Sequence, residues 1–278
     1  MLVVGHLCHD RIPGGFLPGG AAAYAGTLAS RLGYHTALLT SCGPDYRFHH
    51  LFERLDVHSV HSDRTTEFEN IYSGQDRIQY LHSRAAELRP ADLPDHWRGS
   101  RTVLLGPICD EVDPALLEAF SNESFICVCP QGWMRRWDEQ HRVFPKQFER
   151  WDSLVRADLV SLSEGDVNGD WQLLERLAVK FDRLVVTQGS AGATVFEHGR
   201  RRHFPACPAV ERDPTGAGDI FAAAISLHYS RNRHLEAAVH HAQTAAAISI
   251  EGAGLSAVPD ADAVHRRLMR SEAMTGKP

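Results

Sequence analysis

The sequence predicts an α/β fold, a doubly wound and mostly parallel sheet flanked by helices. Two observations carry this prediction. Short apolar runs alternate along the chain with stretches of helical period, and 43% of the 278 residues are hydrophobic, which is enough to bury a large core. Because alternating strands and helices form parallel strands joined by crossover helices, ligands are expected beyond the carboxyl ends of the strands.

Apolar runs rich in leucine and β-branched residues, mostly bounded by turn residues, are the expected buried strands. They span residues 2–5, 36–40, 102–106, 125–129, 159–162 and 184–187. The stretches of helical period span residues 21–32, 114–120, 171–181, 220–229, 235–250 and 261–269. No internal repeat, low-complexity tract or long linker divides the chain, so we expect a single domain of residues 1–278.

One region breaks the alternation and predicts a small β lid. Between residues 65 and 82, apolar and aromatic residues flank a Gly-Gln-Asp turn, which is typical of a β-hairpin. These residues are Phe68, Ile71, Tyr72, Ile78 and Tyr80. A glycine-rich segment near the N-terminus offers further strand. We therefore expect strands inserted at about 11–18 and 65–82 to lie over the ends of the main strands.

Charge and hydropathy exclude several classes of partner. The formal net charge of −6 and the pI near 6.3 disfavour binding to nucleic acid or to an anionic membrane. The longest weakly polar run, residues 237–250, is shorter than the ~20 apolar residues of a membrane span. The chain opens with no charged-then-apolar signal. We expect a cytoplasmic protein whose partners are small molecules or other proteins.

The cysteines and histidines show no metal-ligand spacing. The six cysteines lack a C-x-x-C pair, so reduced thiols are expected rather than a zinc site or a disulfide framework. The seventeen histidines include no H-E-x-x-H motif. The pairs His49-His50 and His240-His241 are expected at surface or helix positions.

The segment DPTGAGDIFAAAI, residues 213–225, predicts an anion site at the start of a helix. Asp213 precedes proline, which disfavours helix there, so the helix is expected to begin near Gly218. The first amides of a helix lack intrahelical partners and carry part of a positive charge, so residues 216–218 would present N–H donors to an anion. Asp219 would then lie where a carboxylate can accept a proton from a hydroxyl. The alternative is an ordinary helix start with Asp219 as a capping residue.

This segment resembles the C-terminal signature of the ribokinase/PfkB carbohydrate kinase family, and the resemblance spans nearly the whole chain. It implies a ribokinase-like fold and transfer of the γ-phosphoryl group of ATP to a hydroxyl of a small polyol or sugar. It also implies that the amides of Gly216, Ala217 and Gly218 form the anion hole and that Asp219 is the general base.

The N-terminal segments LVVGHLCHD and PGGAAAYAG resemble the part of this family that binds the acceptor. The resemblance implies that Asp10, at the end of its strand, and Gly19 and Gly20 bind hydroxyls of a sugar-like acceptor. Tyr24 stands where ribokinases typically carry asparagine, which puts ribose itself in doubt. Taken alone, the glycines could be a turn and Asp10 a polar residue that ends a strand.

LVSLSEGD resembles the N-x-x-E segment of the family, with Ser163 in place of asparagine and Asp166 in place of glutamate. The resemblance implies that Glu164 and Asp166 organise water around Mg²⁺ on the ATP phosphates, since Mg²⁺ prefers oxygen ligands and retains waters. The alternative is a solvated acidic loop after a strand.

Other segments resemble the family's nucleotide site. VVTQGSAGATVF implies that Thr187, Gly189 and Gly192 lie near the phosphates or the ribose, with Thr215 beside them. The helix HHAQTAAAIS implies that Gln243 closes the adenine pocket, although its small residues could equally serve helix packing. Asp213 and the loop of residues 252–256 could form a site for a monovalent cation such as K⁺.

The segments VVGHLCHD, GGAAAY and CPQGWMRRWD look more like plant-type myo-inositol kinases than like ribokinase. This implies that Arg135 binds phosphate or acceptor, to which a guanidinium is suited, and makes myo-inositol or a related carbohydrate the best expectation. A nucleoside kinase or another sugar kinase of the family is the alternative, as is a catalytically silent sugar sensor. P-loop and G-x-G-x-x-G motifs are lacking. An exposed lid edge could also pair two chains into a homodimer.

Overall fold

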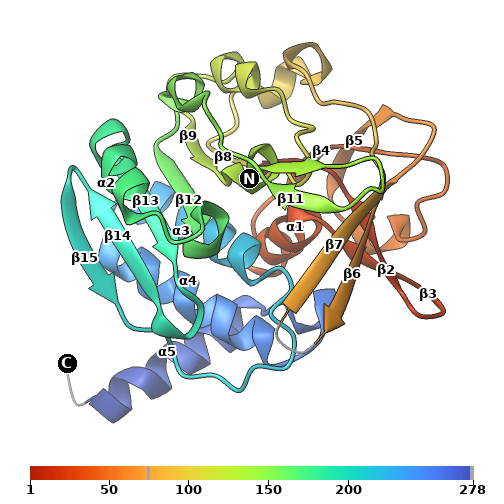
Figure 1. Cartoon of the computed structure of the whole chain (residues 1–278). Coiled ribbons are helices and arrows are strands. Elements are labelled where there is room, and N and C mark those ends of the chain that lie inside the picture. The colour runs from red at the N-terminus through yellow and green to blue at the C-terminus, as the bar shows by residue number, and fades with distance from the viewer. Residues whose placement is uncertain (74–75, 276–278) are drawn as a thin grey trace.

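A nine-stranded sheet forms the centre of the computed structural model, which describes residues 1–73 and 76–275 (Figure 1). Its order is β15-β14-β13-β12-β9-β8-β1-β4-β5. The strands are β1 (Leu2–Val4), β4 (Ala37–Cys42), β5 (Asp56–His61), β8 (Thr102–Leu105), β9 (Phe125–Val128), β12 (Leu159–Ser163), β13 (Arg183–Thr187), β14 (Ala193–Glu197) and β15 (Arg200–Phe204). The pairs from β13 to β5 are parallel, whereas β14 and β15 are antiparallel. The predicted fold class is confirmed.

The helices that cover the sheet are α1 (Ala21–Arg31), α2 (Trp171–Lys180), α3 (Ala217–Asn232), α4 (Leu235–Ile250) and α5 (Ala261–Thr275). The stretch at residues 114–120 forms the 3₁₀ helix Pro114–Ala119 rather than an α-helix. Phe120 returns to extended backbone directly after it, and so short a segment gains little from α-helical hydrogen bonds. Within the described part of the chain, no helix is long and apolar enough to cross a membrane.

Alternate residues of the parallel strands point to opposite faces of the sheet and form two separate cores. Val3 and Leu104 pack with residues of α1, α3 and α4 on one face. Leu2, Val4 and Leu105 pack on the other face with α2 and with tryptophans of the connecting segments. The chain is therefore layered around the sheet, as Figure 1 shows.

A second sheet of four strands, which we call the small sheet, has the order β3-β2-β6-β7. Its strands are β2 (Cys8–Ile12), β3 (Gly15–Gly19), β6 (Thr66–Ser73) and β7 (Asp76–Ser83). Residues 74 and 75 of the expected Gly-Gln-Asp turn lie outside the described residues. A short hairpin of β10 (Arg135–Trp137) and β11 (Val143–Pro145) lies against β7, since the Leu81 N–H donates to the His141 carbonyl at 2.8 Å. In Figure 1 the small sheet lies on the right, away from β15.

The expectation that Asp10 ends the first strand is wrong. β1 ends at Val4, and Asp10 lies within β2, where it pairs with Leu17 of β3 and Phe68 of β6. The chain leaves the large sheet after three residues and crosses to the small sheet, whose ladders take up the backbone groups of the next strand. Asp10 is therefore held by the small sheet.

The two-core arrangement yields a stability prediction. Leu104 is fully buried in the centre of the sheet, so Leu104→Ala is expected to lower the free energy of unfolding by about 2–5 kcal/mol through lost burial and a cavity. Val179→Ala is the control, because that side chain is 87% exposed on α2, and it should change stability by less than ~0.5 kcal/mol. Urea unfolding measures both, and equal small effects would contradict the core assignment.

Candidate active site

A cavity of about 700 Å³ lies where the small sheet meets the carboxyl ends of β9, β12 and β13 and the first residues of α3. Predicted site residues that line it from the small sheet, α1 and β10 are Asp10, Gly20, Tyr24 and Arg135. Those that line it from the strand ends and α3 are Glu164, Asp166, Thr187, Gly189, Thr215, Gly216, Gly218 and Asp219. Segments from both halves of the chain are thus brought to one cavity, as expected for the strand ends of such a sheet.

Two glycines allow the backbone to pack closely around Asp10. A Cβ on Gly19 would overlap the Asp10 carboxylate, so only glycine leaves that carboxylate its place. Gly20, with φ +96°, precedes α1, and a Cβ there would overlap the carbonyl of His6. Gly20 reaches the cavity, whereas Gly19 lies behind Asp10 and is not among the lining residues.

Tyr24 supports the turn that starts α3. Gly216 caps α3 with φ +76°, and a Cβ there would overlap the Tyr24 ring. The ring is almost fully buried, and burial raises the pKa of its hydroxyl. Tyr24 therefore packs beneath the glycine turn as well as lining the cavity. The sequence indicated only that Tyr24 replaces an asparagine typical of ribokinases. Its contact with Gly216 was not predictable, because these two segments meet only in the folded chain.

The start of α3 offers amide donors, but not all of those expected. The Ala217 N–H donates to the Pro214 carbonyl at 3.1 Å, so the expectation that Ala217 presents a free donor is wrong. A tight turn at Pro214 brings that carbonyl within reach. Among the described residues, no oxygen accepts a hydrogen bond from the N–H of Gly216, Gly218 or Asp219. These three amides lie at the positive end of the helix and can bind an anion.

Asp219 has the electrostatic environment of a proton acceptor. Burial raises the pKa of this carboxyl from about 3.8 to about 7, because it disfavours the charged form. Arg135 acts in the opposite direction, while Asp166 and Asp10 add to the rise. A carboxyl that titrates near neutrality beside an anion site can take a proton from a bound hydroxyl at physiological pH.

The two acidic residues after β12 are held by defined hydrogen bonds. The Asp166 carboxylate accepts from the Ser163 N–H at 2.8 Å and from the Gln131 amide at 2.9 Å. Glu164 accepts from the Trp171 indole at 2.6 Å. Ordered carboxylates on a cavity wall suit a hydrated divalent cation, since such ions retain waters that carboxylates can orient.

Arg135 links the small sheet to the loop after β8. Its guanidinium donates to the Ile108 carbonyl at 2.9 Å and lies 5.8 Å from the centre of the Phe68 ring. All three residues line the cavity. Arg135 is thus held in place where its charge acts on Asp219.

Two predicted nucleotide residues, Gly192 and Gln243, are not among the lining residues of the cavity. Gly192 has φ +101°, and a Cβ there would overlap the backbone at Phe204. Gln243 is buried, and its side-chain amide donates to the Phe204 carbonyl at 3.0 Å. Both residues therefore fix the end of β15, and their contact with a nucleotide stays a prediction.

Asp213, the residue expected beside a monovalent cation, joins two loops. Its carboxylate accepts from the N–H groups of Thr215 and Gly254, each at 3.0 Å. Partial burial acts to raise the pKa of Asp213, but these hydrogen bonds lower it overall, so the group stays ionised at neutral pH. The loop of residues 252–256 is thereby tied to the turn before α3.

Sequence reasoning missed an amide pair on the small sheet. The Gln79 side chain of β7 donates to Asn70 of β6 at 3.0 Å, and both line the cavity with Gln131. The signal was available in the predicted hairpin, because the pairing of β6 with β7 places Asn70 opposite Gln79. Nothing in the sequence alone showed which face of the hairpin would cover the site.

Known structures define the class of this fold. A pyrophosphate-dependent myo-inositol-1 kinase converted into a myo-inositol-3 kinase superposes with a TM-score of 0.80, at 19% identity, over 96% of this chain and 99% of that chain. The fold is therefore ribokinase-like. Residues 160–261 match the model of the pfkB family carbohydrate kinases.

Over residues 160–261 the chain is therefore similar to the pfkB family carbohydrate kinases, which are phosphotransferases with an alcohol group as acceptor, and relatives that match most of its length are named as kinases. A cytidine kinase of Thermococcus kodakarensis is 27% identical over 86% of this chain and 91% of the relative. An inositol 3-kinase of Zea mays is 28% identical over 80% of this chain and 64% of the relative. Use of ATP is implied by the family.

The raised pKa of Asp219 makes stability depend on pH. The native state holds a proton that the unfolded chain releases above pH ~4, so the stability that this proton contributes is lost as pH rises through about 7. Asp219→Asn has no proton to lose at this position, so its stability should not fall with pH for this reason. The unfolding free energy of the variant minus that of wild type should therefore be roughly 2–3 kcal/mol larger at pH 8.5 than at pH 5. Chemical denaturation at both pH values tests this, and a constant difference would contradict it.

Proposed function

We propose that this protein transfers the γ-phosphoryl group of ATP to a hydroxyl of a small polyol or sugar, with myo-inositol or a related carbohydrate as the acceptor. One observation carries the proposal: Asp219, with its pKa near 7, shares a cavity with the amides that start α3 and with Asp10 of the small sheet. In this proposal residues 1–278 work as a single domain and the small sheet is its lid. The inositol kinases among the relatives support the choice of acceptor.

The chemistry follows from the positions of these groups. Asp219 takes the proton of the acceptor hydroxyl as that oxygen attacks the γ-phosphorus, and ADP leaves. The amides of Gly216, Gly218 and Asp219 bind the oxygens of the moving phosphoryl group, where negative charge is concentrated. Closure of the lid excludes water, which would otherwise compete as acceptor.

The remaining predicted residues take supporting roles in this proposal. Mg²⁺ bound to the ATP phosphates would offset their negative charge, with Glu164 and Asp166 holding its waters. Thr187, Gly189, Gly192, Thr215 and Gln243 border the nucleotide, and Ala217 shapes the anion turn. Asp213 with the loop of residues 252–256 would hold K⁺; the lowered pKa of Asp213 supports this by keeping it charged.

The lining of the acceptor end favours a polyhydroxylated molecule. The Asp10 carboxylate can accept from hydroxyls, and the side-chain amides of Asn70, Gln79 and Gln131 can both donate and accept. Arg135 adds a cation. Gly19 and Gly20 allow the backbone there to approach a small ring. A nucleoside is the second candidate, supported by the cytidine kinase relative.

We further propose a homodimer in the cytoplasm that pairs through the small sheet. Its outer strand, β3, has no partner on one side among the described strands. Leu17 on β3 is 47% exposed and Ile12 on β2 is 40% exposed. An open edge with exposed apolar side chains is suited to pairing with a second copy.

The acceptor is identified by measuring ADP or phosphate release with a panel of polyols, sugars and nucleosides. Turnover with inositols or sugars supports the proposal. Turnover with nucleosides alone would favour the nucleoside kinase, and binding without turnover would favour a silent sensor. ATP and pyrophosphate are compared as donors, because a pyrophosphate-dependent kinase shares this fold.

Asp219→Asn is expected to lower turnover by at least ~10² while ATP affinity changes little, since a general base acts mainly in the transition state. Calorimetric ATP titration and steady-state kinetics measure the two effects. Asp95→Asn is the control, because that carboxylate is 97% exposed outside the cavity. Near-normal turnover in Asp219→Asn would remove this residue from the role.

Alanine substitutions at Gly216 and Gly218 distinguish an effect on stability from an effect on turnover. Gly216→Ala forces a Cβ into the Tyr24 ring at a positive φ, so we expect a loss of ~1–3 kcal/mol in stability together with lower turnover. Gly218→Ala meets no atom within 4 Å and should leave stability within ~0.5 kcal/mol of wild type. It should still lower turnover, because the methyl group would occupy the place of the phosphoryl group. A fully active Gly218→Ala would contradict the anion site.

A further inference from the structure

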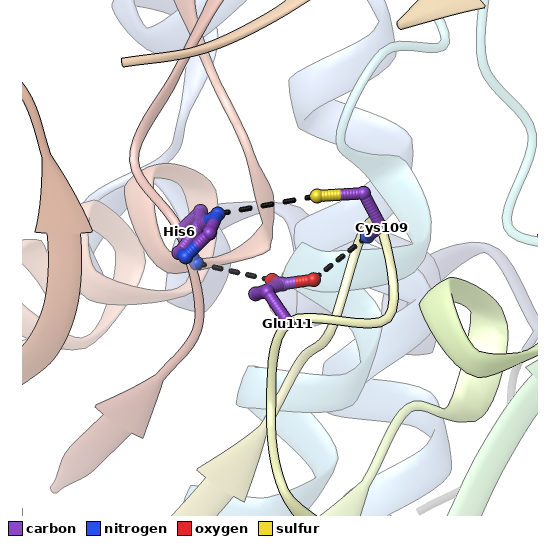
Figure 2. A group of neighbouring side chains, drawn as sticks. All are labelled: His6, Cys109 and Glu111. Carbon is purple, nitrogen blue, oxygen red and sulfur yellow. Dashed lines mark hydrogen bonds between the residues drawn. The ribbon is translucent and has the colours of Figure 1, made fainter. Parts of the chain in front are cut away.

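A buried group of polar side chains lies outside the cavity, at the base of the small sheet. Figure 2 shows its members, His6, Cys109 and Glu111. Each is at most 1% exposed. Their potential metal-ligand atoms lie within 4.8 Å of one another. Among the described residues, this is the one group of three or more His, Cys, Asp or Glu side chains whose ligand atoms lie that close together.

The hydrogen bonds of this group leave no room for a metal ion. The Glu111 carboxylate accepts from the N–H groups of Cys109 at 2.7 Å, Ile108 at 2.9 Å and His6 at 3.2 Å. Nδ1 of His6 lies 2.7 Å from the Thr66 hydroxyl and 3.9 Å from the Cys109 sulfur. Burial raises the pKa of the Cys109 thiol well above its usual range, so it stays protonated. Metal ligation needs a thiolate and open lone pairs.

The partners of His6 determine which ring nitrogen carries the proton. Nε2 lies 2.8 Å from the Ala86 carbonyl, which can only accept, so Nε2 donates. Nδ1 then accepts from the Thr66 hydroxyl, whose oxygen in turn accepts from the Ala85 N–H at 2.9 Å. Burial lowers the pKa of His6 and keeps the ring neutral. Every hydrogen-bonding group of the imidazole is used.

His6 and its hydrogen-bond partners lie where the chain passes between the large and small sheets. His6 lies where the chain crosses from β1 to β2, Thr66 is the first residue of β6, and Ala86 follows β7. One imidazole therefore joins three crossings between the large and small sheets. Through its own N–H it also joins Glu111, which holds the amide of Ile108.

We propose that His6 is a positioning residue that fixes the small sheet over the cavity and, through Glu111 and Ile108, holds Arg135 in place. The step to Arg135 is the bond from its guanidinium to the Ile108 carbonyl. His6 does not line the cavity and touches no reacting atom. Its effect on catalysis rests on the proposed function, but its effect on the small sheet does not.

The test uses three variants of the full chain. His6→Phe keeps the ring volume and removes both ring hydrogen bonds, and Thr66→Val removes the partner of Nδ1. The control is Thr102→Val, which removes a partly buried hydrogen bond of 2.9 Å to Ser230, between β8 and α3. Acceptor KM, ATP KM and amide hydrogen exchange are measured for each variant, together with stability.

We expect His6→Phe and Thr66→Val to raise the acceptor KM at least ~10-fold with less than ~3-fold change in the ATP KM. Amides of residues 8–19 and 66–71 should exchange at least ~10-fold faster than in wild type. Thr102→Val should lose a comparable amount of stability to these two variants, but its acceptor KM and the exchange of these amides should match those of wild type. If His6→Phe does not fold, Thr66→Val carries the test.

Two results would overturn the proposal. The first is a His6→Phe or Thr66→Val variant whose acceptor KM and small-sheet exchange match those of Thr102→Val, which would make the network merely structural. The second is one tightly bound metal per chain that is lost in His6→Phe. If wild type phosphorylates no acceptor, the proposed function fails, and exchange in the small sheet still decides the role of His6.

Discussion

The start of α3 is the constraint on which the rest of the site depends. Burial disfavours a charge on Asp219, whereas the unpaired amides of the first helical turn favour negative charge beside them. Gly216 makes this junction by adopting a backbone conformation that other residues rarely take, with its Cα against the Tyr24 ring. The result is a carboxyl that can exchange a proton near neutrality next to amide donors that can bind an anion.

Acidic side chains outnumber basic ones in the lining of the cavity, where Arg135 lies among Asp10, Glu164, Asp166 and Asp219. Asp10 and Asp166 raise the pKa of Asp219, and Arg135 lowers it. A polyanionic donor would add negative charge and a guanidinium or a divalent cation would offset it, so the protonation of Asp219 is coupled to what the cavity holds. This coupling explains why one arginine contributes both to binding and to the basicity of the general base in the proposed mechanism.

The small sheet depends on the large sheet for its position. Its strands line the cavity, and hydrogen bonds of His6 and Thr66 join it to the main body where the chain crosses between the sheets. Buried, fully paired polar groups at such crossings restrict the backbone to one geometry, because each broken bond would leave an unsatisfied group in a low-dielectric interior. His6 is placed where such a restriction acts on three of these crossings, those into β2 and β6 and the one after β7.

The sequence by itself determined the alternation of strands and helices, and hence the parallel sheet, because these depend on local periodicity and turn residues. It also identified the glycine turn and acid at the start of α3, since they are contiguous. Only the tertiary structure decided that Ala217 is paired, that Asp10 belongs to the small sheet, and that Asn70 and Gln79 face the cavity. Those outcomes depend on contacts between segments far apart in the chain, and no local pattern encodes which distant group comes within hydrogen-bonding distance.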